Sequence, residues 1–225
     1  MFLITLDWQV DSKGYELANA GERYGQVIVR NGGKWIATQP LAGKFDMHYA
    51  EFAGIETAND LKRFVNKYGY LKSARALGGQ SARFEDDSFV FLDEGHDGET
   101  VDEHLEAARL MRLVIRANNA GRKYFPNVQD SLELTRVLSE EDHGHFKIVP
   151  DPKRGFRFEF EATSLMSAMW IQLAQKVSGG TRLRTCLQCG AWFEVGAGTA
   201  KRADSKFCKT AHRVAYSRQT QSKGS

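Results

Sequence analysis

Residues 182–193 read Arg-Leu-Arg-Thr-Cys-Leu-Gln-Cys-Gly-Ala-Trp-Phe, and residues 207–213 read Phe-Cys-Lys-Thr-Ala-His-Arg. The two segments hold all three cysteines of the chain, as Cys-x2-Cys, 18 intervening residues, and Cys-x3-His. A four-coordinate structural Zn²⁺ is held by cysteine and histidine ligands at spacings of this kind. The spacing therefore predicts a Cys3His zinc site whose ligands are Cys186, Cys189, Cys208 and His212.

Local geometry favours both ligand pairs. Two residues between Cys186 and Cys189 allow a tight turn that brings both sulfurs to one ion. Gly190 can adopt the positive φ at which backbone N–H groups face the thiolates. Cys208 and His212 lie on one face, one turn apart, if a helix begins just before them. Because four protein ligands leave no open coordination position, we expect this zinc to be structural.

The same residues predict the architecture of the C-terminal module. A knuckle, a β-rich excursion and a helix that carries the second ligand pair together form the treble-clef or zinc-ribbon plan. We expect the helix to run from Lys206 to Arg218, and Trp192 and Phe193 to pack under the metal; stacking of Trp192 on nucleic acid is the alternative. A free cysteine cluster with a surface histidine, or a redox Cys-x-x-Cys, remains an alternative to zinc.

Charge is distributed unevenly along the chain. Residues 180–225 contain nine Lys or Arg and two Asp or Glu, whereas residues 1–179 contain 22 basic and 26 acidic residues. Clustered guanidinium and ammonium groups suit phosphate contacts, so the basic module predicts nucleic acid as a partner. A solvated or protein-binding face is the alternative. The candidate nucleic-acid contacts are Arg184, Lys201, Arg202, Lys209, Arg213 and Arg218.

Residues 183–218 resemble the CGNR-type zinc finger that follows the ABATE domain in bacterial proteins proposed as stress-linked transcription regulators. The shared features are the basic lead-in Arg182-Leu183-Arg184, the Cys-x-x-Cys-Gly knuckle with its aromatic pair, the basic Lys201-Arg202, and Phe207-Cys208. The Cys-Gly-Asn-Arg signature itself is absent, and His212 stands where that family has a cysteine. The resemblance covers about a sixth of the chain and implies a DNA-contacting finger in a transcription regulator.

The remaining residues, 1–178, predict an α+β body of antiparallel hairpins and amphipathic helices, which would sense a ligand or a partner. Gly179-Gly180 marks the expected boundary with the zinc-binding basic module, residues 179–225. The patterns of apolar residues and caps predict the elements of this body. They are strands over 2–10, 26–30 and 34–38, the last two as a hairpin around 31–33, helices over about 58–68, 100–120, 128–138 and 165–178, and a hairpin of 145–149 with 156–161.

Composition and the N-terminal sequence argue against a membrane or secreted protein. Mean hydropathy is −0.45 and no apolar run approaches the roughly 18 residues of a transmembrane helix, so we expect no membrane association. The N-terminus has no basic n-region, which predicts a cytoplasmic protein. The ten carboxylates between residues 85 and 106 are expected to be solvated; a hard-cation site, or an acidic surface that meets a basic partner such as the chain's own tail, is the alternative.

No dinucleotide, P-loop, nucleophile-elbow or zinc-protease motif is present, so we expect no enzyme. A zinc-stabilised protein-interaction module, with a protein partner or self-association, and an enzyme of unrecognised class are the alternatives to a nucleic-acid-binding regulator.

Overall fold

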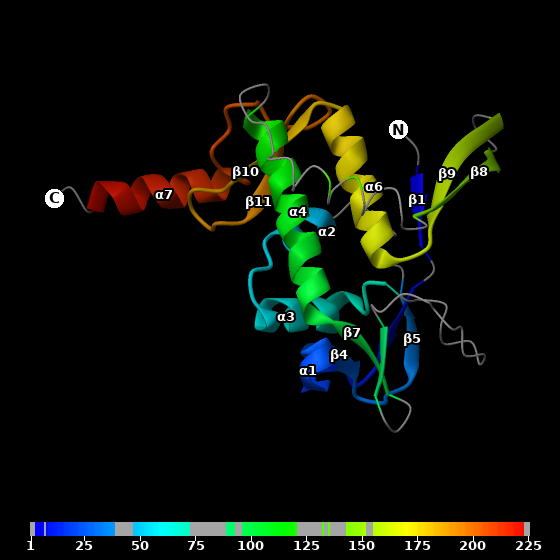
Figure 1. Ribbon diagram of the computed structural model, residues 1–225. Helices are drawn as coiled ribbons and strands as arrows, with labels where there is room; N and C mark the ends of the chain where they lie inside the picture. Colours follow the sequence, from blue (N-terminus) through cyan, green and yellow to red (C-terminus); the bar gives the residue numbers. More distant parts are fainter. Residues whose placement is uncertain are drawn as a thin grey trace.

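Helices and mostly antiparallel strands alternate along the chain in a computed structural model, which confirms the predicted α+β class (Figure 1). The structure describes residues 3–6, 8–38, 47–72, 89–92, 96–120, 132, 135, 143–151 and 155–222. Apart from Leu132 and Thr135, which are helical, the predicted helix over 128–138 lies outside the described residues, as do all five acidic residues between 85 and 95. Among the described residues, no helix combines the length and the apolar character that crossing a bilayer requires.

A four-stranded antiparallel sheet forms one end of the body, with its strands in the order β3-β4-β7-β6. Its centre is β-branched: Val27 and Ile28 of β4 are fully buried, as a pleated, covered surface favours. The short helix α1 (Gly21–Tyr24) connects the first two strands. The strands are β3 (Tyr15–Asn19), β4 (Gln26–Arg30), β6 (Phe89–Leu92) and β7 (His96–Thr100).

A second sheet contains the predicted hairpin of β8 (Gly144–Asp151) and β9 (Gly155–Ala162), with β1 (Leu3–Thr5) added parallel to β9. The hairpin prediction is confirmed, but its apolar face is only partly covered. Phe160 is buried, whereas the neighbours on the same face remain more than half exposed. These exposed neighbours are Phe146, Ile148 and Phe158.

The hairpin predicted around residues 31–33 is wrong, as is the single strand predicted over 2–10. β5 (Trp35–Thr38) pairs with β2 (Trp8–Asp11), and β4 pairs with β3 and β7 instead. The Asp11 carboxylate explains the outcome. It accepts hydrogen bonds from the Gly33 N–H and from Arg30 Nε, both at 2.9 Å, and so directs the turn toward β2. The 2–10 segment is divided between two sheets because β1 pairs with β9.

Among the described residues, four helices pack around the sheets, and caps that the sequence predicted begin two of them. Thr57 and Asp60 form a capping box at the start of α3, and the Ser164 hydroxyl accepts the Ser167 N–H at the start of α6. The helices predicted over 58–68, 100–120 and 165–178 are confirmed within a residue or two, whereas the helix over 48–53 was not predicted. The bounds are α2 (His48–Ala53), α3 (Ala58–Tyr68), α4 (Val101–Ala120) and α6 (Leu165–Ser178).

One large apolar core fills the body. α2 packs against α4 and α6, and α6 also covers β1 and β9. Aromatic rings contribute much of the buried volume, which agrees with their large burial area. The largest fully buried side chains include Trp8, Tyr15, Tyr49, Phe52 and Tyr70.

A buried pair of a carboxylate and an imidazole joins the end of β7 to the first turn of α4. His104 Nε2 lies 2.9 Å from Glu99 Oε2, and both side chains are fully buried, so the prediction that the carboxylates of 85–106 are solvated is wrong for Glu99. The same carboxylate accepts the backbone N–H groups of Leu71 and Lys72 at 2.9 and 2.6 Å. Burial alone would raise the pKa of Glu99, but His104 and these N–H donors hold it below its usual value.

The C-terminal module consists of the hairpin β10 (Thr181–Thr185) and β11 (Trp192–Gly196), followed by the helix α7 (Thr210–Ser222). The hairpin lies against the ends of α4 and α6, and α7 extends to one side of the molecule (Figure 1). A knuckle between two strands with a helix after them is the predicted treble-clef-like plan.

Candidate metal centre and its basic surroundings

The turn between β10 and β11 positions the first ligand pair. The Cys186 N–H donates to the Ala191 carbonyl and the Gly190 N–H donates to the Cys186 carbonyl, both at 2.9 Å. Gly190 has a φ of 71°, in the left-handed region that favours glycine. The tight turn predicted from Cys-x2-Cys-Gly is therefore present, with the sulfurs of Cys186 and Cys189 turned to one point.

The second ligand pair forms differently from the prediction, because α7 begins at Thr210 and not at Lys206 or Phe207. The Lys206 carbonyl accepts the Leu187 N–H at 3.1 Å, so it bonds to the knuckle instead of starting the helix. Cys208 thus precedes α7 and His212 lies in its first turn. The two ligand atoms still meet, with 3.1 Å between Cys208 Sγ and His212 Nδ1.

The four predicted ligands converge, with all their ligand atoms within 4.8 Å of one another. Cys189 Sγ and Cys208 Sγ are 3.8 Å apart, and Cys186 Sγ and His212 Nδ1 are 3.6 Å apart. Tetrahedral Zn²⁺, with Zn–S near 2.3 Å and Zn–N near 2.0 Å, separates such atoms by about 3.8 and about 3.5 Å. The geometry confirms a cluster that could hold a metal ion.

The cluster's electrostatics favour one thiolate and oppose a second. Burial would raise the pKa of the Cys186 thiol, but backbone N–H groups of Cys208, Cys189 and Gln188, together with His212, lower it to about 5. Burial and the two neighbouring thiols raise the pKa of Cys208 to about 11. Several thiolates in one place need a cation between them, which is what a divalent metal supplies.

A small apolar core lies beside the cluster. It contains Cys186, Phe193 and Val195, with Phe207 packed against it. Phe193 packs against the ligand cluster, as predicted, but the same prediction for Trp192 is wrong. Successive β11 residues face opposite sides, so Trp192 instead packs against the core of the body.

Asparagine side chains at the end of α4 attach the module to the body. Asn119 donates to the Leu183 carbonyl at 2.6 Å and accepts the Leu183 N–H at 3.1 Å. Its amide thus occupies the free edge of β10 as a neighbouring strand would. Asn118 donates to the Thr181 carbonyl at 2.8 Å, and the Leu183 side chain is buried in the core of the body.

A second attachment lies on β11. Glu194 accepts the Tyr49 hydroxyl at 3.1 Å and pairs with Lys176 Nζ at 2.9 Å. Burial is the main cause that raises the pKa of Tyr49 above its usual value, and the adjacent Glu194 carboxylate adds to it. This half-buried cluster links α2, α6 and the module, and sequence spacing gave no sign of it because its members are far apart in the chain.

The basic candidates surround the metal cluster from several segments. Arg184 is exposed on β10; Arg202, Lys209, Arg213 and Arg218 are exposed along the loop and α7. Lys201 is half-exposed, with its Nζ 6.0 Å from the centre of the Phe193 ring. Within the described part of the chain, none of these six side chains forms an ion pair. They do not share a single face, because Arg213 and Arg218 are five residues apart, about 140° around a helix.

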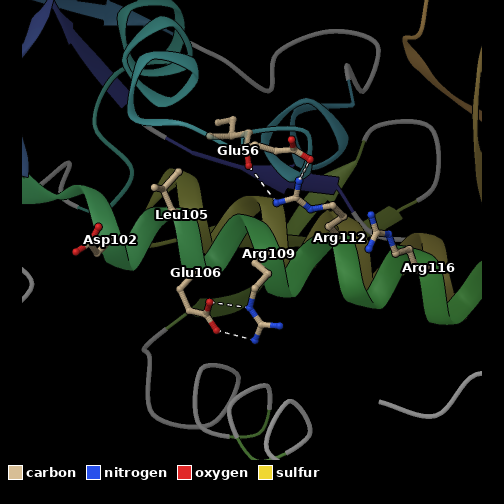
Figure 2. Close-up of a pocket in the computed structure, with 8 residues that line it drawn as sticks. Glu56, Asp102, Leu105, Glu106, Arg109, Arg112 and Arg116 are labelled. Carbon is tan, nitrogen blue, oxygen red and sulfur yellow. Dashed lines mark hydrogen bonds and ion pairs between the residues drawn. The ribbon is translucent and has the colours of Figure 1, made fainter. Parts of the chain in front are cut away.

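The described residues line one surface depression on the body and another between the body and the module. The larger, about 480 Å³, runs along α4, where Arg109 pairs with Glu106 and Arg112 pairs with Glu56 (Figure 2). Its charges are therefore mostly satisfied internally; Arg116 at one end forms no ion pair with a described residue. The other, about 380 Å³, lies where α2 meets the module and is lined by Met47, Ala50, Glu51, Ala191 and Trp192.

No protein-family model matches this chain, and no curated protein sequence matches it. The similarity of residues 183–218 to the CGNR-type finger therefore stays a prediction carried by the motifs themselves.

Proposed function

We propose that this protein is a nucleic-acid-binding transcription regulator whose Cys3His cluster holds a structural Zn²⁺. In this proposal the module contacts nucleic acid and the body senses a ligand or a partner. Binding, and not catalysis, is its function. The single observation that carries the proposal is α7, a basic helix that leaves the body and is anchored at its metal end.

The isolation of α7 supports the proposal. None of its described side chains is buried; His212, Ala215 and Tyr216 are half-buried and the rest are exposed. A 13-residue helix with so little packing is marginally stable by itself. Fixing His212 to the cluster holds its first turn, and a partner along its length would stabilise the remainder.

Charge indicates which partner. Between Ser205 and Gln221 there is no carboxylate, whereas Lys206, Lys209, Arg213 and Arg218 are present. Since these side chains form no ion pairs with described residues, they need not break internal contacts to bind phosphates. Metal anchoring near Lys209 and Arg213 also lowers the entropy lost when they bind.

The depression where α2 of the body meets the C-terminal module supports a sensing role for the body. A ligand in the depression between α2 and Trp192 would touch the body and the module together. Such a ligand could change the position of the knuckle through β11, and with it the position of α7.

The test measures binding of the zinc-loaded full chain to a fluorescent DNA duplex across salt concentrations. Four to six phosphate contacts give a log–log slope of roughly −3.5 to −5.5. The double variant Lys209→Gln/Arg213→Gln should flatten the slope by about 2. Lys13→Gln/Lys34→Gln is the matched control, since it removes the same charge from exposed positions of the body.

Absence of binding at low salt, or equal slopes for the two double variants, would contradict the proposal. The protein-interaction module would then be the better account. Val214, which is 42% exposed on α7, is the observation that favours this second candidate. Its own test is capture of an acidic protein surface that Lys209→Gln/Arg213→Gln no longer binds.

A further inference from the structure

The inner side of α7 is defined by its half-buried residues. His212 belongs to the metal cluster, and the Tyr216 ring lies 5.4 Å from the Phe207 ring. Ala215 is the third half-buried residue. At about 100° per residue, these three positions cluster on one side of the helix.

The opposite side carries a stripe of exposed, uncharged residues. Thr210, Val214, Ser217 and Gln221 follow one another at spacings of four, three and four, and all are exposed. Such spacing places residues on one face. The centre of this stripe lies about half a turn from the inner side, so it points away from the module.

Two arginines border the stripe. Arg213 and Arg218 lie on either side of its centre, each about 70° away around the helix. The basic residues that seemed scattered therefore flank a central uncharged face. A partner that matches this pattern has two negatively charged ridges with hydrogen-bonding groups between them.

We infer that α7 is a recognition helix that enters the major groove of duplex DNA, an inference that rests on the proposed function. The stripe faces the base edges, and Arg213 and Arg218 reach the phosphates of the two groove walls. The major groove, about 12 Å wide, accepts a helix whose diameter with side chains is 10–12 Å. Duplex RNA does not fit, because its major groove is deep and narrow.

The stripe's chemistry indicates which base edges it reads. Gln221 can bond both groups that adenine exposes in the major groove, and the Ser217 and Thr210 hydroxyls can donate or accept. Val214 offers an apolar surface to the methyl group of thymine. We therefore expect preferred sites that contain A·T pairs where Gln221 and Val214 lie.

The experiment selects duplexes from a library with randomised central positions, using the zinc-loaded full chain, and sequences those that bind. Wild type should enrich a defined motif. Gln221→Ala and Ser217→Ala should keep one zinc and keep salt-dependent binding. Gln221→Ala should lose about 5- to 150-fold of the preference at one position, and Ser217→Ala, which removes a single hydroxyl, should lose less at another. Gln219→Ala is the matched control, because this glutamine lies on the other side of α7 and should leave the motif unchanged.

Three outcomes separate the two claims. Salt-dependent duplex binding without any enriched motif would overturn the inference and leave the proposed function intact. A motif that survives both Gln221→Ala and Ser217→Ala would do the same. Absence of binding to any nucleic acid would instead reject the proposed function itself.

Discussion

The body and the C-terminal module are stabilised in different ways. The body buries a continuous core to which α2, α3, α4 and α6 all contribute, whereas the module's own core is Cys186, Phe193 and Val195 with Phe207 and Cys208 beside them. So small a cluster buries too little apolar surface to order some 40 residues. Hydrophobic burial therefore determines the fold of the body, whereas we propose that a metal ion held by the four ligand residues stabilises the module.

Loss of a metal ligand should have the largest effect, and it should be confined to the module. Cys186→Ser removes both the most buried ligand and part of the small core. Structural zinc sites supply about 10–16 kcal/mol of apparent binding free energy, so β10, β11 and α7 should unfold. Metal analysis together with circular dichroism checks this, with Ser217→Ala as the control. Bound zinc in Cys186→Ser at wild-type affinity would contradict the assignment.

The matching change in the body is Glu99→Gln. This change leaves buried His104 opposite an uncharged group and turns an amide N–H₂ toward the Leu71 and Lys72 N–H groups. We therefore expect the free energy of unfolding to fall by about 3–5 kcal/mol. Zinc content should stay unchanged, because the cluster lies in the other part. Denaturant unfolding of both proteins tests this, and a wild-type midpoint in Glu99→Gln would contradict it.

Glu99 also gives the body a pH dependence of known sign. The pKa of Glu99 is lowered in the folded state, so its contribution to the free energy of unfolding is fully present above the unfolded pKa, near 4.3. That contribution is lost as pH falls below this value and through the lower folded pKa. Unfolding midpoints measured between about pH 6 and pH 3 should fall in wild type and change less in Glu99→Gln.

Truncation after Ser178 tests the boundary. We expect residues 1–178 to fold without the module, with stability reduced by about 1.5–3 kcal/mol, because the site that Leu183 fills in the main core is emptied. Thermal unfolding of the truncated chain provides the measurement. An insoluble or molten product would show that the module is part of the body's core.

The smallest expected effect is at the contact between the body and the module, where Asn118 and Asn119 bond to β10. Asn119→Ala leaves the N–H and the carbonyl of Leu183 unpaired, at a cost of about 1–3 kcal/mol, and should loosen β10 without releasing zinc. Asn118→Ala removes one hydrogen bond and should have a smaller effect. Hydrogen exchange of the Leu183 amide distinguishes the two variants. Equal protection in both would contradict the edge-pairing role of Asn119.

Sequence patterns predicted the features that depend on neighbours along the chain. The Cys-x2-Cys-Gly knuckle, the cap at Thr57 and the 20-residue helix α4 are local, and all three are present. The four metal ligands were predictable because the residues of each ligand pair are close in sequence. The sequence also contains only one Cys-x2-Cys and one Cys-x3-His that could combine.

The errors arose where a distant residue decided the outcome. The Asp11 carboxylate accepts the Gly33 N–H, so the turn at Gly33 leads to β2 instead of closing the predicted hairpin. The Lys206 carbonyl accepts the Leu187 N–H, so α7 begins at Thr210 and not at Lys206. The Glu99–His104 pair was missed because nothing in its spacing indicates that both side chains are fully buried beside the Leu71 backbone.

Hydrogen exchange of the full chain with its metal bound and after chelation tests the central claim most directly. The metal-bound protein should contain one zinc per chain and protect amides in β10, β11 and the first turn of α7. Chelation should remove protection from residues 181–222 and leave α4, α6 and the β3-β4-β7-β6 sheet protected. Unchanged protection of the module without metal, or loss of protection throughout the body, would contradict the account.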